Sequence, residues 1–150
     1  IESIHQRVSP HADYRPLSGS LVASLTQRMR DQQSLFAQTG GCHGAAAVRL
    51  ADGAVLALAE DVGRHNAVDK VAGALMMSDA LPDQDAALWV SGRASFEMVQ
   101  KALMAGFAAL ICVGAPTSLA VEMARSSHLT LVGFSTGSRY NVYAGEVTGE

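Results

Sequence analysis

Five polar segments that carry glycine recur along this 150-residue sequence, each close to a run of apolar residues. They are TGGCHG (39–44), EDVGRHN (60–66), SGRAS (91–95), GAPTS (114–118) and FSTGSR (134–139). Arg64, Arg93 and Arg139 each lie beside a glycine or serine in such a segment, where arginine can make forked hydrogen bonds to phosphate. Three segments precede predicted helices, whose first N–H groups attract anions. We therefore expect a phosphate-bearing ligand, such as a nucleotide or a dinucleotide cofactor.

Each segment also has a simpler interpretation. The Gly-Gly pair of TGGCHG is typical of a plain turn, and SGRAS is typical of a helix cap with a solvated arginine. Glu60 and Asp61 fit a surface acid pair, and His65 fits a helix-start residue bonded to backbone. The hypothesis of a site depends on all five segments falling at the carboxyl ends of strands in one sheet, where ligands bind in open α/β folds.

The two cysteines differ in their surroundings. Cys42 lies in a glycine turn beside His43, which can lower the pKa of a thiol, so Cys42 is a candidate nucleophile. Cys112 lies in the apolar run LICVG and is typical of a small buried side chain. No C-x-x-C, H-x-x-x-H or H-x-E spacing is present, so we expect no metal site. Two cysteines make no disulfide framework, and we expect a cytoplasmic protein.

The first half of the chain contains the less regular elements. Leu21, Val22, Leu25 and Met29, with Phe36 as a further member, predict a helix behind the caps Ser18 and Ser20. The pair Asp52-Gly53 predicts a hairpin that joins Ala45–Leu50 to Val55–Ala59. Asn66 is the predicted cap of the next helix, which buries Val68, Val71, Ala72, Leu75 and Met76.

The second half alternates short apolar strands with helices of about ten residues. The predicted strands are Ala86–Val90, Ala109–Val113 and Leu129–Phe134, with helices Ser95–Ala105 and Thr117–Ser126 between them and an edge strand at Tyr140–Tyr143. This alternation predicts a three-layer αβα sandwich with a mixed sheet. Residues 1–17, which are polar and contain proline, are predicted to be an arm or linker, and 18–150 a single α/β domain.

Composition excludes several classes of protein. An apolar fraction of 49% argues for a folded domain, and the net charge of −3 gives no general attraction to nucleic acid or membranes. No apolar run approaches the length of about 18 residues that a transmembrane helix needs. We therefore expect neither a nucleic-acid nor a membrane partner.

Taken together, the segments resemble one known family. TGGCHGAA, EDVGRHNAVDKVAGA, SGRASFEMVQKA, APTSLAVEMA and LVGFSTGSRYNVY, in this order, closely resemble the formate dehydrogenase accessory sulfurtransferases, FdhD. The resemblance implies a fold similar to that of cytidine deaminases, with a pocket for the guanine-dinucleotide form of the molybdenum cofactor and GDP-like nucleotides as mimics. The cofactor-binding residues that it implies, together with the turns above, are Gly40, Gly41, His43, Asp61, Gly63, Arg64, His65, Asn66, Ser91, Gly92, Arg93, Ser95, Phe134, Ser135, Thr136, Gly137, Ser138 and Arg139.

The resemblance also implies an activity and partners. Family members take sulfur from a cysteine desulfurase and pass it to molybdenum bis(molybdopterin guanine dinucleotide), without which formate dehydrogenase is inactive. A homodimer is implied as well. The leading hypothesis is therefore a sulfurtransferase, and the alternative is a non-enzymatic carrier of the cofactor.

One departure from the family pattern concerns the sulfur carrier, which is a C-x-x-C pair upstream of the TGG segment. The residues before TGGCHG contain no cysteine, so no catalytic residue is expected in this chain, and Cys42 does not inherit the role. The loop has been cut away or the chemistry lost, and Ile1 as the first residue favours the former. A zinc-free nucleotide hydrolase using Glu60 or Asp61 is a third hypothesis. A zinc deaminase is not expected, because its H-x-E and P-C-x-x-C motifs are absent.

Overall fold

A computed structural model of the protein describes residues 10–32, 42–78 and 85–149. Its helices are α2 (Gly19–Asp31), α4 (Arg64–Met77), α5 (Phe96–Met104) and α6 (Ser118–Ser126). The main sheet contains β2 (His43–Arg49), β3 (Val55–Asp61), β4 (Ala86–Val90), β5 (Ala109–Cys112), β6 (Thr130–Thr136) and β7 (Arg139–Ala144). Two short strands, β1 (Leu17–Ser18) and β8 (Val147–Thr148), pair with each other in parallel.

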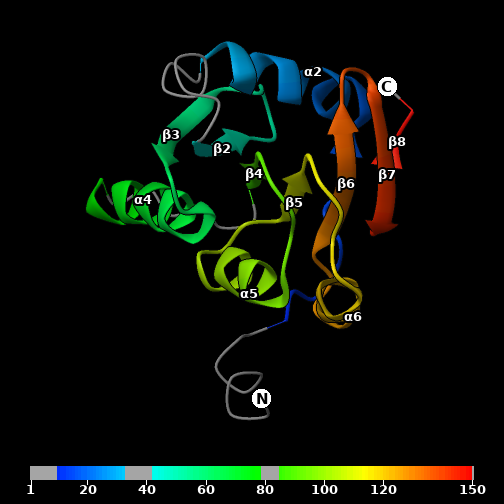
Figure 1. The fold of residues 1–150 in the computed structure, drawn as a ribbon. Coiled ribbons are helices and arrows are strands. Elements are labelled where there is room, and N and C mark those ends of the chain that lie inside the picture. The colour runs from blue at the N-terminus through cyan, green and yellow to red at the C-terminus, as the bar shows by residue number, and fades with distance from the viewer. Residues whose placement is uncertain (1–9, 33–41, 79–84, 150) are drawn as a thin grey trace.

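The main sheet is mixed and has the strand order β3-β2-β4-β5-β6-β7. Strands β4, β5 and β6 are parallel, β2 is antiparallel to both of its neighbours, and β7 is antiparallel to β6. Figure 1 shows α2 on one side of the sheet and α4, α5 and α6 on the other. The predicted three-layer αβα sandwich with a mixed sheet is confirmed.

Two apolar clusters cover the two faces of the sheet, because successive strand residues point to opposite sides. On one face, Leu88 and Val90 pack with the buried residues of α4, α5 and α6. On the other face, Ala87 and Trp89 pack with the apolar side of α2. The central strands β4 and β5 are buried on both faces, and their sequences are therefore continuous apolar runs.

Several predicted elements have the expected bounds. The strand Ala86–Val90 is β4, and Ser95 and Thr117 cap α5 and α6 with their hydroxyl groups. Ser18 caps α2. The Asp52-Gly53 hairpin is present between β2 and β3. In that turn the Asp52 carboxylate accepts the Ala54 N–H at 3.0 Å, and Gly53 has a φ of +71°.

The start of α4 was predicted wrongly. The helix begins at Arg64, with Gly63 at the cap position, so Asn66 lies inside the first turn. The Asn66 side-chain amide donates to Asp61 Oδ1 at 3.4 Å and does not cap the helix. On the side predicted to be buried, Met76 is 65% exposed. Phe36, the last predicted member of the first helix, lies outside the described residues.

The segment before α2, which the sequence assigns to an arm, is described from Pro10 and lies against the domain. His11 is buried, its Nε2–H donates to the Phe107 carbonyl at 2.8 Å, and its backbone N–H donates to the Ser127 carbonyl at 2.9 Å. Leu17 is also buried and pairs with Val147. His11 and Leu17 therefore hold this segment against the domain, whereas Pro10, Ala12, Asp13, Arg15 and Pro16 are exposed.

Candidate functional site

The described parts of the predicted site segments lie at one edge of the main sheet. The prediction that all five follow strands is wrong for TGGCHG, because His43 and Gly44 begin β2, which runs antiparallel to its neighbours. Strands β3, β4, β5 and β6 all run toward this edge, and β2, which is antiparallel to β3 and β4, begins there. His43 is paired with Asp61, and Ala45 with Val90. The turns that follow β3, β4 and β5 therefore lie side by side, next to the start of β2.

Backbone hydrogen bonds join these turns in a row. Gly44 exchanges two bonds with Ser91: its N–H donates to the Ser91 hydroxyl at 2.8 Å, and its carbonyl accepts the Ser91 N–H at 3.0 Å. The Gly114 N–H donates to the Gly92 carbonyl at 2.9 Å, and the Phe134 N–H donates to the Gly114 carbonyl at 3.1 Å. Segments separated by up to 90 residues are thus held at fixed distances from one another.

Glycines in this row allow side chains to lie directly on the backbone. A Cβ placed on Gly92 would lie 3.5 Å from Nδ1 of His43, so the imidazole packs over this turn. A Cβ placed on Gly114 would lie 3.0 Å from Cγ of Arg93 and 3.2 Å from the Gly92 carbonyl oxygen. His43 and Arg93 therefore lie next to each other along the row, each above a glycine.

Asp61 organises the turn that leads into α4. Its Oδ1 accepts the Gly63 N–H at 2.9 Å, and its Oδ2 forms an ion pair with Lys70 Nζ at 2.8 Å. The hydrogen bond from Lys70, followed by that from Gly63, lowers the pKa of Asp61 to about 2. Asp61 is thus ionised at neutral pH, and it holds Gly63, the residue at the cap position of α4.

His65 lies close to the charged side chains of α5. Partial burial is the largest cause that lowers its pKa from the ordinary value, and the positive charges of Lys101 and Arg64 lower it further. Glu97 and Asp69 oppose this shift. The lowered pKa favours the neutral imidazole, which lies at the α4–α5 side of the row of turns.

The SGRAS segment has the geometry of the simpler of its two interpretations, a helix cap with a solvated arginine. Ser95 accepts the Met98 N–H at 3.2 Å as the cap of α5, so its hydroxyl has a structural partner. Arg93, two residues earlier, is exposed. The cap is the simpler role, while the arginine remains open to solvent at the edge of the sheet.

The FSTGSR segment forms the tip of the β6–β7 hairpin and extends past the edge where β5 ends. Thr136, Gly137, Ser138 and Arg139 are exposed, and Gly137 has a φ of +56° that its turn requires. Ser135 differs: it is fully buried, and its hydroxyl is hydrogen-bonded to Thr26 of α2 at 2.8 Å. The hydroxyl predicted to bind cofactor at this position thus faces the protein interior.

The two cysteines have unequal exposure. Cys112 is fully buried at the end of β5, where its thiol donates to the Gly114 carbonyl at 3.2 Å, and burial raises its pKa to about 12. Cys42 is partly exposed and precedes β2. Gly40 and Gly41, also predicted to bind cofactor, lie outside the described residues.

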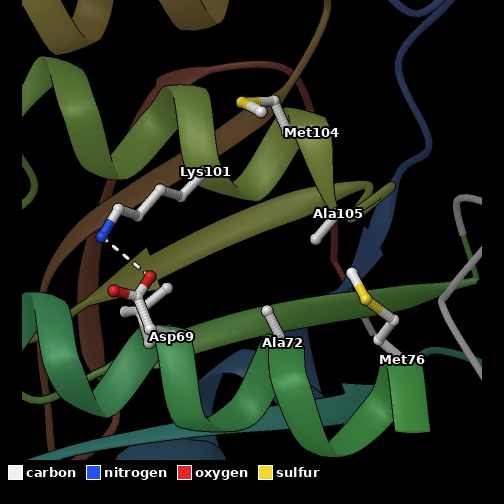
Figure 2. A pocket seen from close by; sticks show the side chains of 7 residues that line it. Asp69, Ala72, Met76, Lys101, Met104 and Ala105 are labelled. Atoms are coloured by element: carbon white, nitrogen blue, oxygen red, sulfur yellow. Dashed lines mark hydrogen bonds and ion pairs between the residues drawn. The ribbon is translucent and has the colours of Figure 1, made fainter.

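A separate pocket of about 230 Å³ lies between α4 and α5 (Figure 2). Its lining residues are Val68, Asp69, Ala72, Met76, Lys101, Met104 and Ala105. Lys101 Nζ and Asp69 Oδ1 form an ion pair of 2.8 Å within it. None of the predicted site residues lines this pocket. The sequence signal for it is weak, because methionines at helical spacing predict buried core equally well.

Among residues 10–32, 42–78 and 85–149 there is no group of three or more His, Cys, Asp or Glu side chains that could hold a metal ion. Within these ranges no helix has the length and apolar character needed to span a bilayer.

The chain is similar to curated bacterial proteins named sulfur carrier protein FdhD. It is 54% identical over 130 residues to the protein of Streptomyces avermitilis, covering 87% of this chain and 46% of the relative. With the protein of Mycobacterium tuberculosis it shares 49% identity over 137 residues, covering 91% of this chain and 49% of the relative. The chain therefore spans about half the length of these relatives.

The fold also matches a solved structure. The crystal structure assigned as a formate dehydrogenase accessory protein from Desulfotalea psychrophila superimposes with a TM-score of 0.83 at 31% sequence identity, covering 97% of this chain and 61% of that one. The sequence model of the FdhD/NarQ family matches residues 1–148. With nearly every residue matched by the family model and the same fold in a solved relative, this chain belongs to the FdhD/NarQ family.

Proposed function

We propose that this chain is the cofactor-binding portion of a sulfur carrier that serves formate dehydrogenase. The support is the family membership together with the names of the relatives, which describe a sulfur carrier and a formate dehydrogenase accessory protein. Because the chain spans about half of those relatives, activity of the whole protein is part of the proposal. The substrate is molybdenum bis(molybdopterin guanine dinucleotide), and its guanine-nucleotide parts bind along the row of turns.

The observation that carries this proposal is the alignment of exposed arginines with helix starts on one edge of the sheet. Arg93 and Arg139 are exposed there, and Arg64 opens α4. The first turns of α4, α5 and α6 also lie at this edge, because each helix follows a strand that ends there. Guanidinium groups and helix N-termini together favour phosphate groups. The exposed hairpin tip supplies Thr136 and Ser138 as further hydrogen-bonding groups.

The first test measures GDP binding by calorimetry. Arg139→Ala should weaken binding by about 1.5–3 kcal/mol, because a charged hydrogen bond to the nucleotide is lost. Arg49→Ala is the matched control: Arg49 is an exposed arginine at the other end of β2, away from the row of turns. Equal GDP affinity in wild type, Arg139→Ala and Arg49→Ala would reject the assignment of the tip as a nucleotide site.

The partners follow from the same proposal. A cysteine desulfurase donates the sulfur, formate dehydrogenase receives the sulfurated cofactor, and the carrier acts as a homodimer in the cytoplasm. A persulfide-bearing thiolate must be accessible and must move between donor and acceptor. The buried Cys112, with its raised pKa, meets neither requirement.

A second candidate function, cofactor carriage without sulfur transfer, is favoured by the state of this thiol. The test incubates the 150-residue chain with a cysteine desulfurase and L-cysteine and then measures the mass of each cysteine-containing peptide. We expect no stable persulfide on Cys112 or Cys42 and retained GDP binding. An adduct of one sulfur on Cys42 that then activates formate dehydrogenase would contradict carriage and make Cys42 the carrier.

A further inference from the structure

Three polar side chains meet inside the otherwise apolar layer between α2 and the sheet. The Thr26 hydroxyl of α2 lies 2.8 Å from the Ser135 hydroxyl of β6, and it accepts the indole N–H of Trp89 from β4 at 3.1 Å. Trp89 and Ser135 are fully buried, and Thr26 is nearly so. A buried indole N–H and a buried hydroxyl each need a partner. Thr26 serves both at once.

The neighbour of Ser135 has an unusual backbone. Phe134 has a φ of +52°, a left-handed conformation that residues other than glycine rarely adopt, and the residue is 47% exposed. Such a conformation persists only where the surrounding structure holds it, and it is common where a ligand is bound.

Phe134 is held from both directions along the chain. On its N-terminal side, Gly133 is clamped: a Cβ there would lie 2.8 Å from both Pro116 Cδ and Tyr143 Cε2. The Phe134 N–H itself donates to the Gly114 carbonyl. On its C-terminal side, Ser135 turns inward to Thr26. The inward bond of Ser135 and the outward position of Phe134 are thus two results of one backbone conformation.

We propose that Thr26 is a positioning residue, which holds the FSTGSR tip in its binding orientation through Ser135 with Trp89 as the fixed anchor. This inference rests on the proposed nucleotide site at the tip. It adds to that site a residue of α2, more than 100 positions away in the sequence, that touches no ligand. The buried hydrogen bond between Thr26 and Ser135 then affects how tightly the exposed FSTGSR tip binds a nucleotide.

The test compares Thr26→Val, Thr26→Ser and Thr130→Val in the 150-residue chain. Thr26→Val keeps the shape of the side chain and removes the hydroxyl, whereas Thr26→Ser keeps the hydroxyl. Thr130 is the matched control, because its buried hydroxyl donates to the Arg15 carbonyl at 3.2 Å at the opposite end of β6. If Thr26→Val does not fold, Ser135→Ala removes the same bond from its other end.

Three measurements are made on each variant. They are the hydrogen-exchange rate of the Phe134 amide, the indole resonance of Trp89, and the dissociation constant for GDP. Trp89 is the one tryptophan in the sequence, so its indole resonance needs no assignment. We expect Thr26→Val to shift this resonance, speed Phe134 exchange and weaken GDP binding about fivefold or more. Thr26→Ser and Thr130→Val should match wild type in Phe134 exchange and in GDP affinity.

The outcomes separate this inference from the proposed function. Wild-type exchange at Phe134 in Thr26→Val would overturn the positioning role. Faster exchange with wild-type GDP affinity would overturn the link between positioning and binding. If the wild-type chain binds no GDP, the proposed nucleotide site fails, and the Phe134 exchange rate still decides whether Thr26 holds the tip.

Discussion

Single residues of the predicted site divide into two groups by what their polar atoms bind. Asp61, Ser91, Ser95 and Ser135 have hydrogen-bond partners within the protein, and each fixes a turn, a helix start or a strand. Arg93, Thr136, Ser138 and Arg139 are exposed at the same edge. The first group holds the turns of the site in place, and the side chains of the second group are exposed to a ligand.

Asp61 gives a prediction for the dependence of stability on pH. Its pKa falls from the ordinary 3.8 to about 2 in the folded protein, so the unfolded chain binds the proton more readily. The stabilisation is therefore complete above about pH 4 and is lost as the pH falls toward 2. Asp61→Asn should be less stable than wild type at pH 7, with the difference shrinking across this range in urea denaturation.

A second variant checks the cause of the Asp61 shift. Lys70→Met removes the hydrogen bond that lowers the pKa of Asp61 most, so this pKa should rise toward its ordinary value. The pH range over which Asp61 loses its contribution to stability should then become narrower. Asparagine at position 61 still accepts the Gly63 N–H through its amide oxygen, which isolates the effect of charge. A stability difference between wild type and Asp61→Asn that stays constant from pH 7 to pH 2 would contradict this account.

At the scale of elements, close approach between β6 and its neighbours depends on Gly133. An added Cβ would lie 2.8 Å from Pro116 on one side and Tyr143 of β7 on the other, closer than carbon atoms pack. Gly133→Ala should lower the free energy of unfolding by about 1–3 kcal/mol, as overpacking does.

The control for this substitution is Gly73→Ala in α4, where an added Cβ meets no atom within 4 Å. Alanine there should stabilise the protein by up to about 1 kcal/mol, because it favours the helix over the unfolded chain. Urea denaturation of Gly133→Ala and Gly73→Ala measures both changes in the free energy of unfolding. Equal effects of the two substitutions would show that β6 can move away from its neighbours.

The elements also mark where sequence reasoning succeeds and where it fails. The strand Ala86–Val90 was predicted correctly because it is short, apolar and bounded by polar turns. The start of α4 was predicted wrongly because Asn66 is a good cap by type, yet Asp61 binds its amide from five residues away. Capping preferences describe one residue and its own helix, and they contain no information about such a neighbour.

The candidate site was only partly predictable for a similar reason. Convergence of the turns at one edge follows from the alternation of strands and helices, which the sequence contains. The inward direction of Ser135 does not, because it depends on the left-handed backbone of Phe134, a non-glycine residue. Likewise, the placement of β2 beside β4 is a matter of topology, since residues 50–85 separate them in the chain.

Across the described part of the molecule, α4, α5 and α6 cover one face of the main sheet and α2 covers the other. The face that carries α2 has the smaller apolar cluster, in which Leu25 is fully buried. Leu25→Ala should cost about 2–5 kcal/mol in unfolding free energy, the usual range for a buried leucine. Leu119→Ala in α6 is the matched control, because Leu119 is 58% exposed and its loss should change stability by about 0.5 kcal/mol at most.

The prediction for Leu25→Ala can be contradicted by its control. If Leu25→Ala and Leu119→Ala were equally mild, α2 would contribute little to the stability of the folded chain. Thermal unfolding of the two variants, followed by circular dichroism, distinguishes the cases. A large loss with Leu25→Ala alone indicates that the packing of α2 on the sheet stabilises the folded chain.

The pairing of β1 with β8 has a mechanical consequence. The two strands are parallel, with Leu17 opposite Val147, and the Leu17 N–H donates to the Glu146 carbonyl at 3.1 Å. Tension applied to the chain before Leu17 and after Thr148 pulls these strands along their lengths in opposite directions. The bonds between them are then loaded together in shear and do not open one by one. The short pair therefore acts as a clamp that carries tension applied at Leu17 past α2 and the sheet, whereas tension applied before His11 first loads its bonds to the Phe107 and Ser127 carbonyls.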